Sequence, residues 1–134
     1  DTGLEQAREI SLCPVLGIGE SSFLLSYLFS GKTAVITTVH EAVPIIKKNI
    51  KNAGYSTLIS EVIAADIEVL DLEFSPAQSA VKFAQASKAL DGSTQNIILG
   101  CAGAVKIKDE FETITGYKSF DGVTSAAKLC RALL

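Results

Sequence analysis

Apolar residues along this chain follow two patterns that alternate with each other. Apolar positions three or four residues apart predict helices at residues 3–10, 20–29, 43–53, 76–84, 104–115 and 123–134. Shorter runs, rich in β-branched residues or alternating apolar with polar ones, predict strands at residues 13–19, 32–38, 67–73, 95–100 and 117–121. The pattern therefore predicts a chain that passes repeatedly from strand to helix.

Strands that alternate with helices form βαβ units, so the predicted fold class is α/β, with a parallel sheet flanked by helices. The carboxyl ends of parallel strands lie at one edge of the sheet, and ligands of such folds bind beyond that edge. Three predicted strand ends are of interest: Thr37–Thr38, Glu73–Phe74 and Gly100–Cys101. We expect the functional site where these ends meet.

Composition and charge narrow the classes of partner. The net charge of −3 gives no sign of the basic face that nucleic acid or an anionic membrane surface requires, so we expect neither as a partner. No apolar stretch approaches the ~20 residues that span a bilayer. Three cysteines without C-x-x-C spacing and a single histidine predict neither a disulfide framework nor a metal site. A reducing, cytoplasmic setting is the expectation.

The segment GCAG, residues 100–103, is the strongest candidate for chemistry. A cysteine between a strand end and a helix start lies near backbone N–H groups, which favour the thiolate over the thiol. The small residues Gly100, Ala102 and Gly103 leave room for a substrate to approach those N–H groups, which could also stabilise an oxyanion. The alternative is that Cys101 only fills a tight turn, since free cysteines are often buried.

Other candidates have simpler interpretations beside the functional one. Thr37 and Thr38 could hydrogen-bond a ligand, or could be there because β-branched residues suit strands. His40 is interpreted as a solvated loop residue rather than a general base, and Cys13 and Cys130 as structural thiols. The segment GIGESS, residues 17–22, lacks the third glycine of a dinucleotide-binding fingerprint.

Several segments together resemble one family. They are DTGLEQAREI, CPVLGIGES, TAVITT, VLDLE, DGSTQNIILGCAGA and FDGVTSAAKLCRALL. They are similar to the aspartate/glutamate/hydantoin racemase superfamily, and within it to the hydantoin and allantoin racemases. The resemblance implies two α/β lobes around a small-molecule substrate, no cofactor, and one cysteine in each lobe that exchanges a proton with the stereocentre.

The resemblance implies roles for particular residues and parts of the chain. Cys101 would be the acid/base cysteine of the second lobe, with Gly100, Ala102 and Gly103 binding the substrate and Thr37 and Thr38 lining the cleft. Residues 32–116 would form the second lobe. Residues 1–31 would be a first-lobe or crossover remnant, and residues 117–134 a return to the first lobe. The first cysteine of the family would lie just upstream of residue 1, and a homo-oligomer is implied.

The resulting prediction is a cofactor-independent racemase of a small ring amide, of hydantoin or allantoin type. Inverting a carbon centre needs a proton source on each face, so we expect a chain that carries only the second cysteine to be inactive in racemisation by itself. A one-cysteine decarboxylase or isomerase of the same superfamily is an alternative. A non-catalytic ligand-binding subunit is another.

Overall fold

Four parallel strands form the central sheet of the computed structural model, which describes residues 1–133. The order across the sheet is β2-β1-β3-β4. The strands are β1 (Lys32–Thr37), β2 (Ile59–Ala64), β3 (Thr94–Leu99) and β4 (Lys118–Asp121). The prediction of an α/β fold with a parallel sheet flanked by helices is confirmed.

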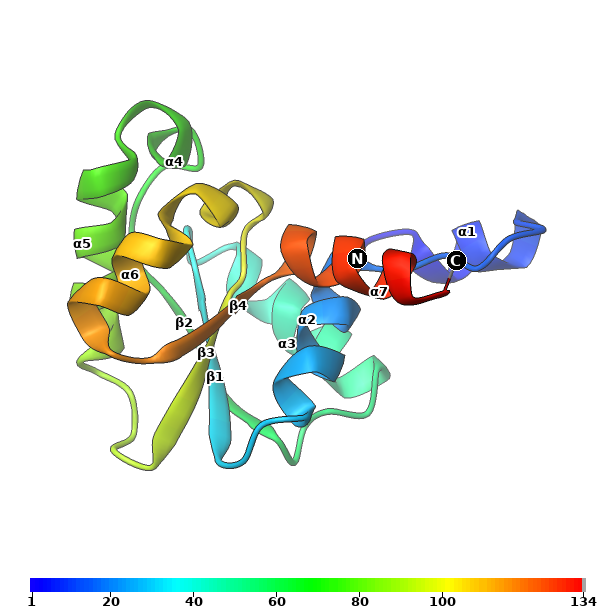
Figure 1. Ribbon diagram of the computed structural model, residues 1–134, viewed down its shortest axis with the longest axis horizontal. Coiled ribbons are helices and arrows are strands. Elements are labelled where there is room, and N and C mark those ends of the chain that lie inside the picture. Colours follow the sequence, from blue (N-terminus) through cyan, green and yellow to red (C-terminus); the bar gives the residue numbers. More distant parts are fainter. Residues whose placement is uncertain (134) are drawn as a thin grey trace.

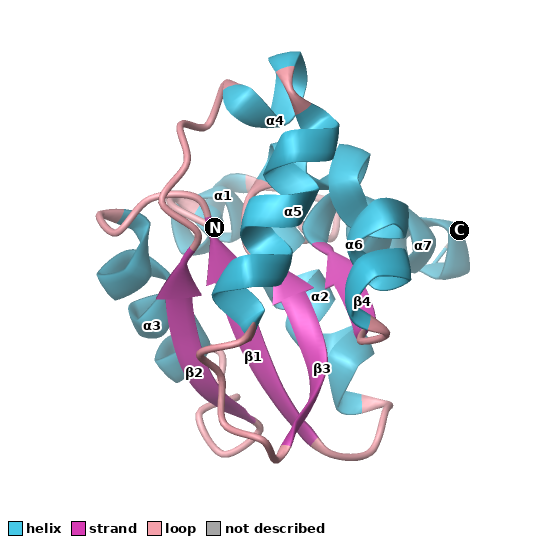
Figure 2. Ribbon diagram, turned by 90° about the vertical axis from the view of Figure 1, so that its left-hand side faces the viewer, coloured by secondary structure: helices cyan, strands magenta, loops and turns pink. Residues whose placement is uncertain are grey.

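Helices cover both faces of the sheet (Figures 1 and 2). On one face lie α2 (Ile18–Tyr27) and α3 (Ala42–Asn52), and on the other α5 (Pro76–Ser87) and α6 (Lys108–Thr115). Successive strand residues alternate between two buried clusters because side chains of a strand point to opposite faces. Val35 and Ile98 pack with Phe23 beneath α2, whereas Ile36 and Ile97 pack on the opposite face.

Short helical segments surround the carboxyl edge of the sheet, and two helices extend away from it. The segment α4 (Asp71–Phe74) and the 3-10 helix η1 (Ala102–Ile107) lie near that edge. Helices α1 (Leu4–Ile10) and α7 (Gly122–Leu133) run to the right of the sheet in Figure 1, and α1 has no buried residue. No helix in residues 1–133 is both long and apolar enough to cross a membrane.

The expected strand at residues 13–19 is wrong. This segment is irregular, and α2 already begins at Ile18. Pro14 has no N–H to donate to a neighbouring strand, and the carbonyl of Val15 accepts a hydrogen bond from the Arg8 side chain at 3.1 Å. The segment is therefore held by a side chain rather than by a strand partner.

The expected strand at residues 67–73 is also wrong. The strand between α3 and α5 that joins the sheet is β2, which lies earlier in the chain. Residues 67–73 turn at the carboxyl edge, where the Asp71 carboxylate accepts the Glu68 N–H at 3.2 Å and α4 begins. β2 is an edge strand of mixed burial, with a register irregularity opposite Thr33 and Ala34. Both features weaken the alternation by which a strand is recognised in sequence.

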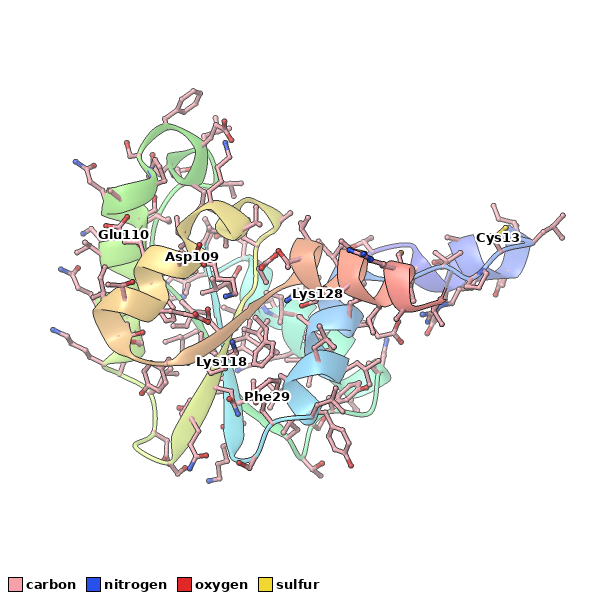
Figure 3. The ribbon with its side chains drawn as sticks, viewed as in Figure 1. Cys13, Phe29, Asp109, Glu110, Lys118 and Lys128 are labelled. Atoms are coloured by element: carbon pink, nitrogen blue, oxygen red, sulfur yellow. The ribbon has the colours of Figure 1, made fainter. Side chains whose placement is uncertain are left out.

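The last strand ties residues 118–121 to the same sheet as β1 to β3. β4 pairs with β3 in parallel, with Leu99 opposite Asp121. Phe29, just after α2, packs its ring on Phe120 with centroids 5.1 Å apart, and the Lys118 ammonium lies 5.9 Å from the Phe29 ring (Figure 3). The division of the chain at residues 31 and 116 stays a prediction.

Candidate active site

Cys101 lies at the point where β3 passes into a helical turn. The N–H of Gly100 donates to the Ile36 carbonyl at 2.8 Å, which extends the pairing of β3 with β1 by one residue. Cys101 is extended, with φ −133° and ψ 140°, and its carbonyl accepts the Ala104 N–H at 3.0 Å. The thiol is therefore fixed at the start of η1, where the first N–H groups of a helical segment have no acceptor within it.

Position 100 has to be glycine because neighbouring atoms leave no room for a side chain. A Cβ at this position would lie 2.7 Å from Cγ1 of Val35 and 3.3 Å from Cδ1 of Ile46. Val35 is fully buried, so it has little room to move away. The glycine thus brings the end of β3 close to β1 and α3, and this packing holds the Cys101 turn in place.

Of the other two small residues, only Ala102 lines the cleft that contains Cys101. A Cβ on Gly103 would meet the side chain of Leu72 at 3.2 Å, and Leu72 is almost completely buried. Gly103 therefore accounts for the close packing of α4 on η1. Packing against Leu72 is therefore a structural reason for glycine at position 103. The predicted contact of Gly103 with substrate is a separate matter and stays a prediction.

The two threonines lie below the edge of the cleft. Thr37 and Thr38 are buried, and neither is among the residues that line the cleft. The Thr37 hydroxyl donates to the Gly100 carbonyl at 3.4 Å, a long hydrogen bond. Their carbonyls accept the N–H groups of Ala65 and Ile67. In this structure both threonines join the ends of neighbouring strands, and contact with a substrate stays a prediction.

The cleft around Cys101 encloses about 490 Å³ of empty space, counted with the solvent at its mouth. Its walls come from the ends of β1 and β3, from the first turns of α2, from α3 and from the start of α7. The residues are Asp1, Ile18, Gly19, Ser22, Phe23, Val35, Ile46, Asn49, Ile98, Leu99, Gly100, Cys101, Ala102 and Gly122. The cleft is mainly apolar, and its polar side chains are the Cys101 thiol, the Asp1 carboxylate, the Ser22 hydroxyl and the Asn49 amide.

Asp1 is the site residue that sequence reasoning missed. Its carboxylate accepts the backbone N–H groups of Gly19 at 2.9 Å and Glu20 at 2.7 Å, in the first turn of α2. Ser21 and Ser22 lie inside the helix, and their hydroxyls donate to the carbonyls of Gly17 and Gly19. The available signal was a helix start at Gly17 without a capping side chain of its own.

A second carboxylate lies buried beside the Cys101 strand. Asp121 ends β4 opposite Leu99 and is only 1% exposed. Its Oδ1 accepts the Thr124 N–H at 2.7 Å and so caps α7. Its Oδ2 is buried without a hydrogen-bond partner among the described residues.

His40 pairs with Asp66 at the same edge of the sheet. The distance from Nε2 of His40 to Oδ1 of Asp66 is 2.8 Å, and both side chains are largely exposed. Asp66 has a φ of 54°, the left-handed region that side chains rarely adopt. Neither residue lines the Cys101 cleft. The interpretation of His40 as a loop residue agrees with its exposure.

The remaining thiols lie outside the cleft. Cys13 and Cys130 are both exposed, which contradicts the burial on which their interpretation as structural thiols rests. Cys13 follows α1 at the far end of the extended region (Figure 3). Within residues 1–133, no group of three His, Cys, Asp or Glu side chains is arranged to hold a metal ion.

Comparisons with known proteins give one consistent picture. The family model described as Asp/Glu/Hydantoin racemase matches residues 1–130. The chain is 37% identical over 137 residues to a hydantoin racemase from Rhizobium meliloti, covering 100% of this chain and 56% of that protein. It is 27% identical over 136 residues to a hydantoin racemase from Pseudomonas sp. (strain NS671), covering 100% of this chain and 55% of that protein. The chain thus spans about half the length of the curated relatives it matches.

Solved structures extend the comparison. An allantoin racemase from Pseudomonas fluorescens superposes with a TM-score of 0.91 at 29% identity, over 99% of this chain and 57% of that one. An allantoin racemase from Klebsiella pneumoniae gives a TM-score of 0.87 at 26% identity, over 98% of this chain and 54% of that one. A glutamate racemase from Thermus thermophilus shares the fold, with a TM-score of 0.67 at 20% identity over 96% of this chain and 49% of that one.

Proposed function

Because the chain belongs to the Asp/Glu/hydantoin racemase family, we propose that it is the part of a racemase that carries one of two proton-transferring groups, the thiol of Cys101. The observation that carries the proposal is the position of this thiol. It lies at the start of a helical segment, half-buried, in a cleft at the carboxyl edge of the sheet. Catalytic thiols act in such partly exposed places near backbone N–H groups.

The proposed reaction is a proton transfer at the carbon next to a carbonyl. The Cys101 thiolate takes the proton, so that the C–H bond breaks and an S–H bond forms. The electron pair moves onto the carbonyl oxygen, where the N–H groups at the start of η1 would stabilise the negative charge. A proton returned to the opposite face of the planar intermediate gives the other enantiomer, and a second acid is required there.

We propose that this second acid is a thiol from outside the described cleft residues. Cys101 is the one thiol among them, and Cys13 and Cys130 lie on exposed surfaces elsewhere. We propose that residues 32–116 form the second of two lobes. On this view residues 1–31 and 117–134 are crossover or first-lobe segments, and the first lobe supplies the other group. We further propose an assembled homo-oligomer in a reducing, cytoplasmic compartment, working without a cofactor.

The proposed substrate is a small ring amide of hydantoin or allantoin type. The support is the names of the relatives, hydantoin and allantoin racemases, together with the residues that line the cleft. The apolar walls of the cleft suit a ring with a side chain, and the thiol and backbone groups suit the polar atoms of a ring amide.

The first test measures the chemistry of the thiol in this chain. With Cys13 and Cys130 both replaced by serine, alkylation by iodoacetamide reports on Cys101 alone. We expect reaction at mildly acidic pH, because the backbone N–H groups favour the thiolate. A matched variant that keeps only Cys130 should react at higher pH. If Cys101 reacts no earlier than Cys130, the proposed acid/base role is wrong.

The second test measures racemisation by loss of optical rotation from an enantiopure 5-substituted hydantoin. We expect no turnover by the 134-residue chain alone, and turnover by a two-lobed protein that contains it. Cys101→Ser in that protein should abolish turnover in both directions, because a hydroxyl is too weak an acid and base at neutral pH. Cys130→Ser is the matched control and should remain active. Release of CO₂ from an arylmalonate without racemisation would instead identify a one-cysteine decarboxylase.

A further inference from the structure

The Gly17–Glu20 segment holds the carboxylate of a distant residue. Gly19 and Glu20 are the second and third residues of α2, the positions whose N–H groups a capping side chain normally accepts. Gly17, at the capping position, has no side chain to do so. The Asp1 carboxylate takes this role, with hydrogen bonds of 2.9 Å and 2.7 Å from Gly19 and Glu20.

The two glycines leave the space that the carboxylate fills. A Cβ on Gly19 would lie 2.9 Å from Oδ2, 3.3 Å from Cγ and 3.5 Å from Oδ1 of Asp1. A Cβ on Gly17 would lie 2.6 Å from Cγ of Asp1 and 2.6 Å from Cδ2 of Leu4. Gly17 has an ordinary φ of −80°, so the reason for glycine here is space rather than backbone conformation. The spacing Gly-x-Gly thus forms a cradle for Asp1.

The cradle is part of the Cys101 cleft. Asp1, Ile18 and Gly19 line the same cleft as the thiol. The N-terminus is level with the strand arrowheads in Figure 2, which mark the carboxyl edge of the sheet. The Asp1 carbonyl also accepts the Leu4 N–H at 3.3 Å, which connects the carboxylate to the start of α1. Asp1 is therefore part of the wall of the cleft, attached to α2 through its carboxylate.

We propose that Asp1 is a positioning residue of the Cys101 site, which acts in two ways. Its hydrogen bonds to α2 hold Asp1 in the wall of the cleft, where it limits access to the thiol. Its negative charge offsets the positive end of the α2 dipole, which otherwise faces the cleft and would favour the Cys101 thiolate. The catalytic significance of this control rests on the proposed proton-transfer function, in which Cys101 has to serve both as thiol and as thiolate.

The experiment measures access to Cys101 and its pH dependence in the full 134-residue chain. Both exposed cysteines are replaced by serine, so that every alkylation event reports on Cys101. Rate constants are measured over pH with a small reagent, iodoacetamide, and a bulky one, fluorescein maleimide. Asp1→Ala should raise the ratio of bulky to small rate constants about tenfold, which corresponds to about 1.4 kcal/mol of lost capping. It should also move the pH midpoint of alkylation downward.

Four further variants separate the two roles of the carboxylate. Asp1→Asn keeps an acceptor oxygen but no charge, so it should restore the access ratio while the midpoint stays low. Gly19→Ala should reproduce the opening caused by Asp1→Ala, because its Cβ displaces the carboxylate. In the Asp1→Ala background, Gly19→Ala should cause no additional opening. Glu5→Ala, which removes an exposed acid in the first turn of α1, is the control and should change neither quantity.

The proposal is overturned if Asp1→Ala leaves both the access ratio and the midpoint unchanged. It is also overturned if Glu5→Ala has the same effect as Asp1→Ala, or if Gly19→Ala leaves the access ratio unchanged. The midpoint of urea unfolding shows whether each variant is folded. If Asp1→Ala is unstable, the alkylation rates of Asp1→Asn still test the effect of the charge. These readouts require no turnover. A failure of racemisation in the two-lobed protein would therefore be recognised separately from a failure of the Asp1 role.

Discussion

Replacing Gly100 by alanine tests whether close packing of strands fixes the Cys101 turn. The added Cβ would lie 2.7 Å from Cγ1 of Val35, 3.3 Å from Cδ1 of Ile46 and 3.4 Å from the Ile36 carbonyl oxygen. Carbon atoms in good contact are about 3.5–4.0 Å apart. Val35 and Ile36 are fully buried, so the strands have to separate or the side chains have to leave their preferred rotamers.

The expected cost follows from these contacts. Overpacking of a buried site costs about 1–3 kcal/mol. The loss of glycine's freedom in the unfolded chain returns about 0.4–1 kcal/mol. We therefore expect Gly100→Ala to lower the free energy of unfolding by about 1–2 kcal/mol, a fall in Tm of about 4 °C per kcal/mol. Urea and thermal unfolding followed by circular dichroism measure both quantities.

Two comparisons make the result decisive. Gly92→Ala introduces a Cβ with nothing within 4 Å and should be neutral or slightly stabilising. Val35→Ala removes the atom that the new Cβ meets, and alone should cost about 2 kcal/mol. Because each change relieves the other, the double variant should be more stable than the sum of the single effects predicts, by about 1 kcal/mol or more. If Gly100→Ala is as mild as Gly92→Ala, or if the two changes are additive, the packing argument is wrong.

Two further predictions concern acidic residues outside the cleft wall. Burial raises the pKa of Glu112, but hydrogen bonds from Ser119 and Lys108 outweigh it, so the net pKa is below its ordinary value of 4.5. A carboxyl group whose pKa is lowered by folding stabilises the protein above its unfolded pKa, and this stability is lost as the pH falls through the folded pKa. Glu112→Gln should therefore make the Tm fall less steeply below pH 4.5. A fall of Tm as steep as in the unchanged protein would contradict this. Asp121→Ala should cost about 1 kcal/mol through loss of the α7 cap, and Asp121→Asn, which retains an acceptor for Thr124, should cost less in thermal unfolding. Equal losses in the two variants would show that the cap contributes nothing.

The sequence predicted those elements whose pattern is local. β1, β3 and β4 were recognised from buried or alternating runs, and the glycine and cysteine after β3 could be placed at the carboxyl edge because parallel strands end together. The strand β2 was missed because it is a half-exposed edge strand with an irregular register. Residues 67–73 alternate in sequence like a strand, yet the Asp71 side chain and the turn at Glu68 fold them back on themselves.

The candidate site was predicted only in part, for a similar reason. The Cys101 turn is a contiguous motif, whereas the contact of Asp1 with Gly19 and Glu20 joins residues far apart in the chain. A glycine-rich helix start without a capping side chain does indicate that a cap comes from elsewhere, but not from which residue. Likewise, the sequence showed that Gly100 and Gly103 are small, but not that Val35 and Leu72 are the neighbours that require it.

The place of β3 in the sheet has a consequence for the timing of motions around the thiol. β3 is paired with β1 on one side and β4 on the other, so its amide hydrogens exchange with solvent only when the sheet itself opens. The Cys101 turn is anchored directly to this interior strand. We therefore expect fast motions in the segments around the cleft, and a backbone at Cys101 that stays in place while a substrate is aligned against it.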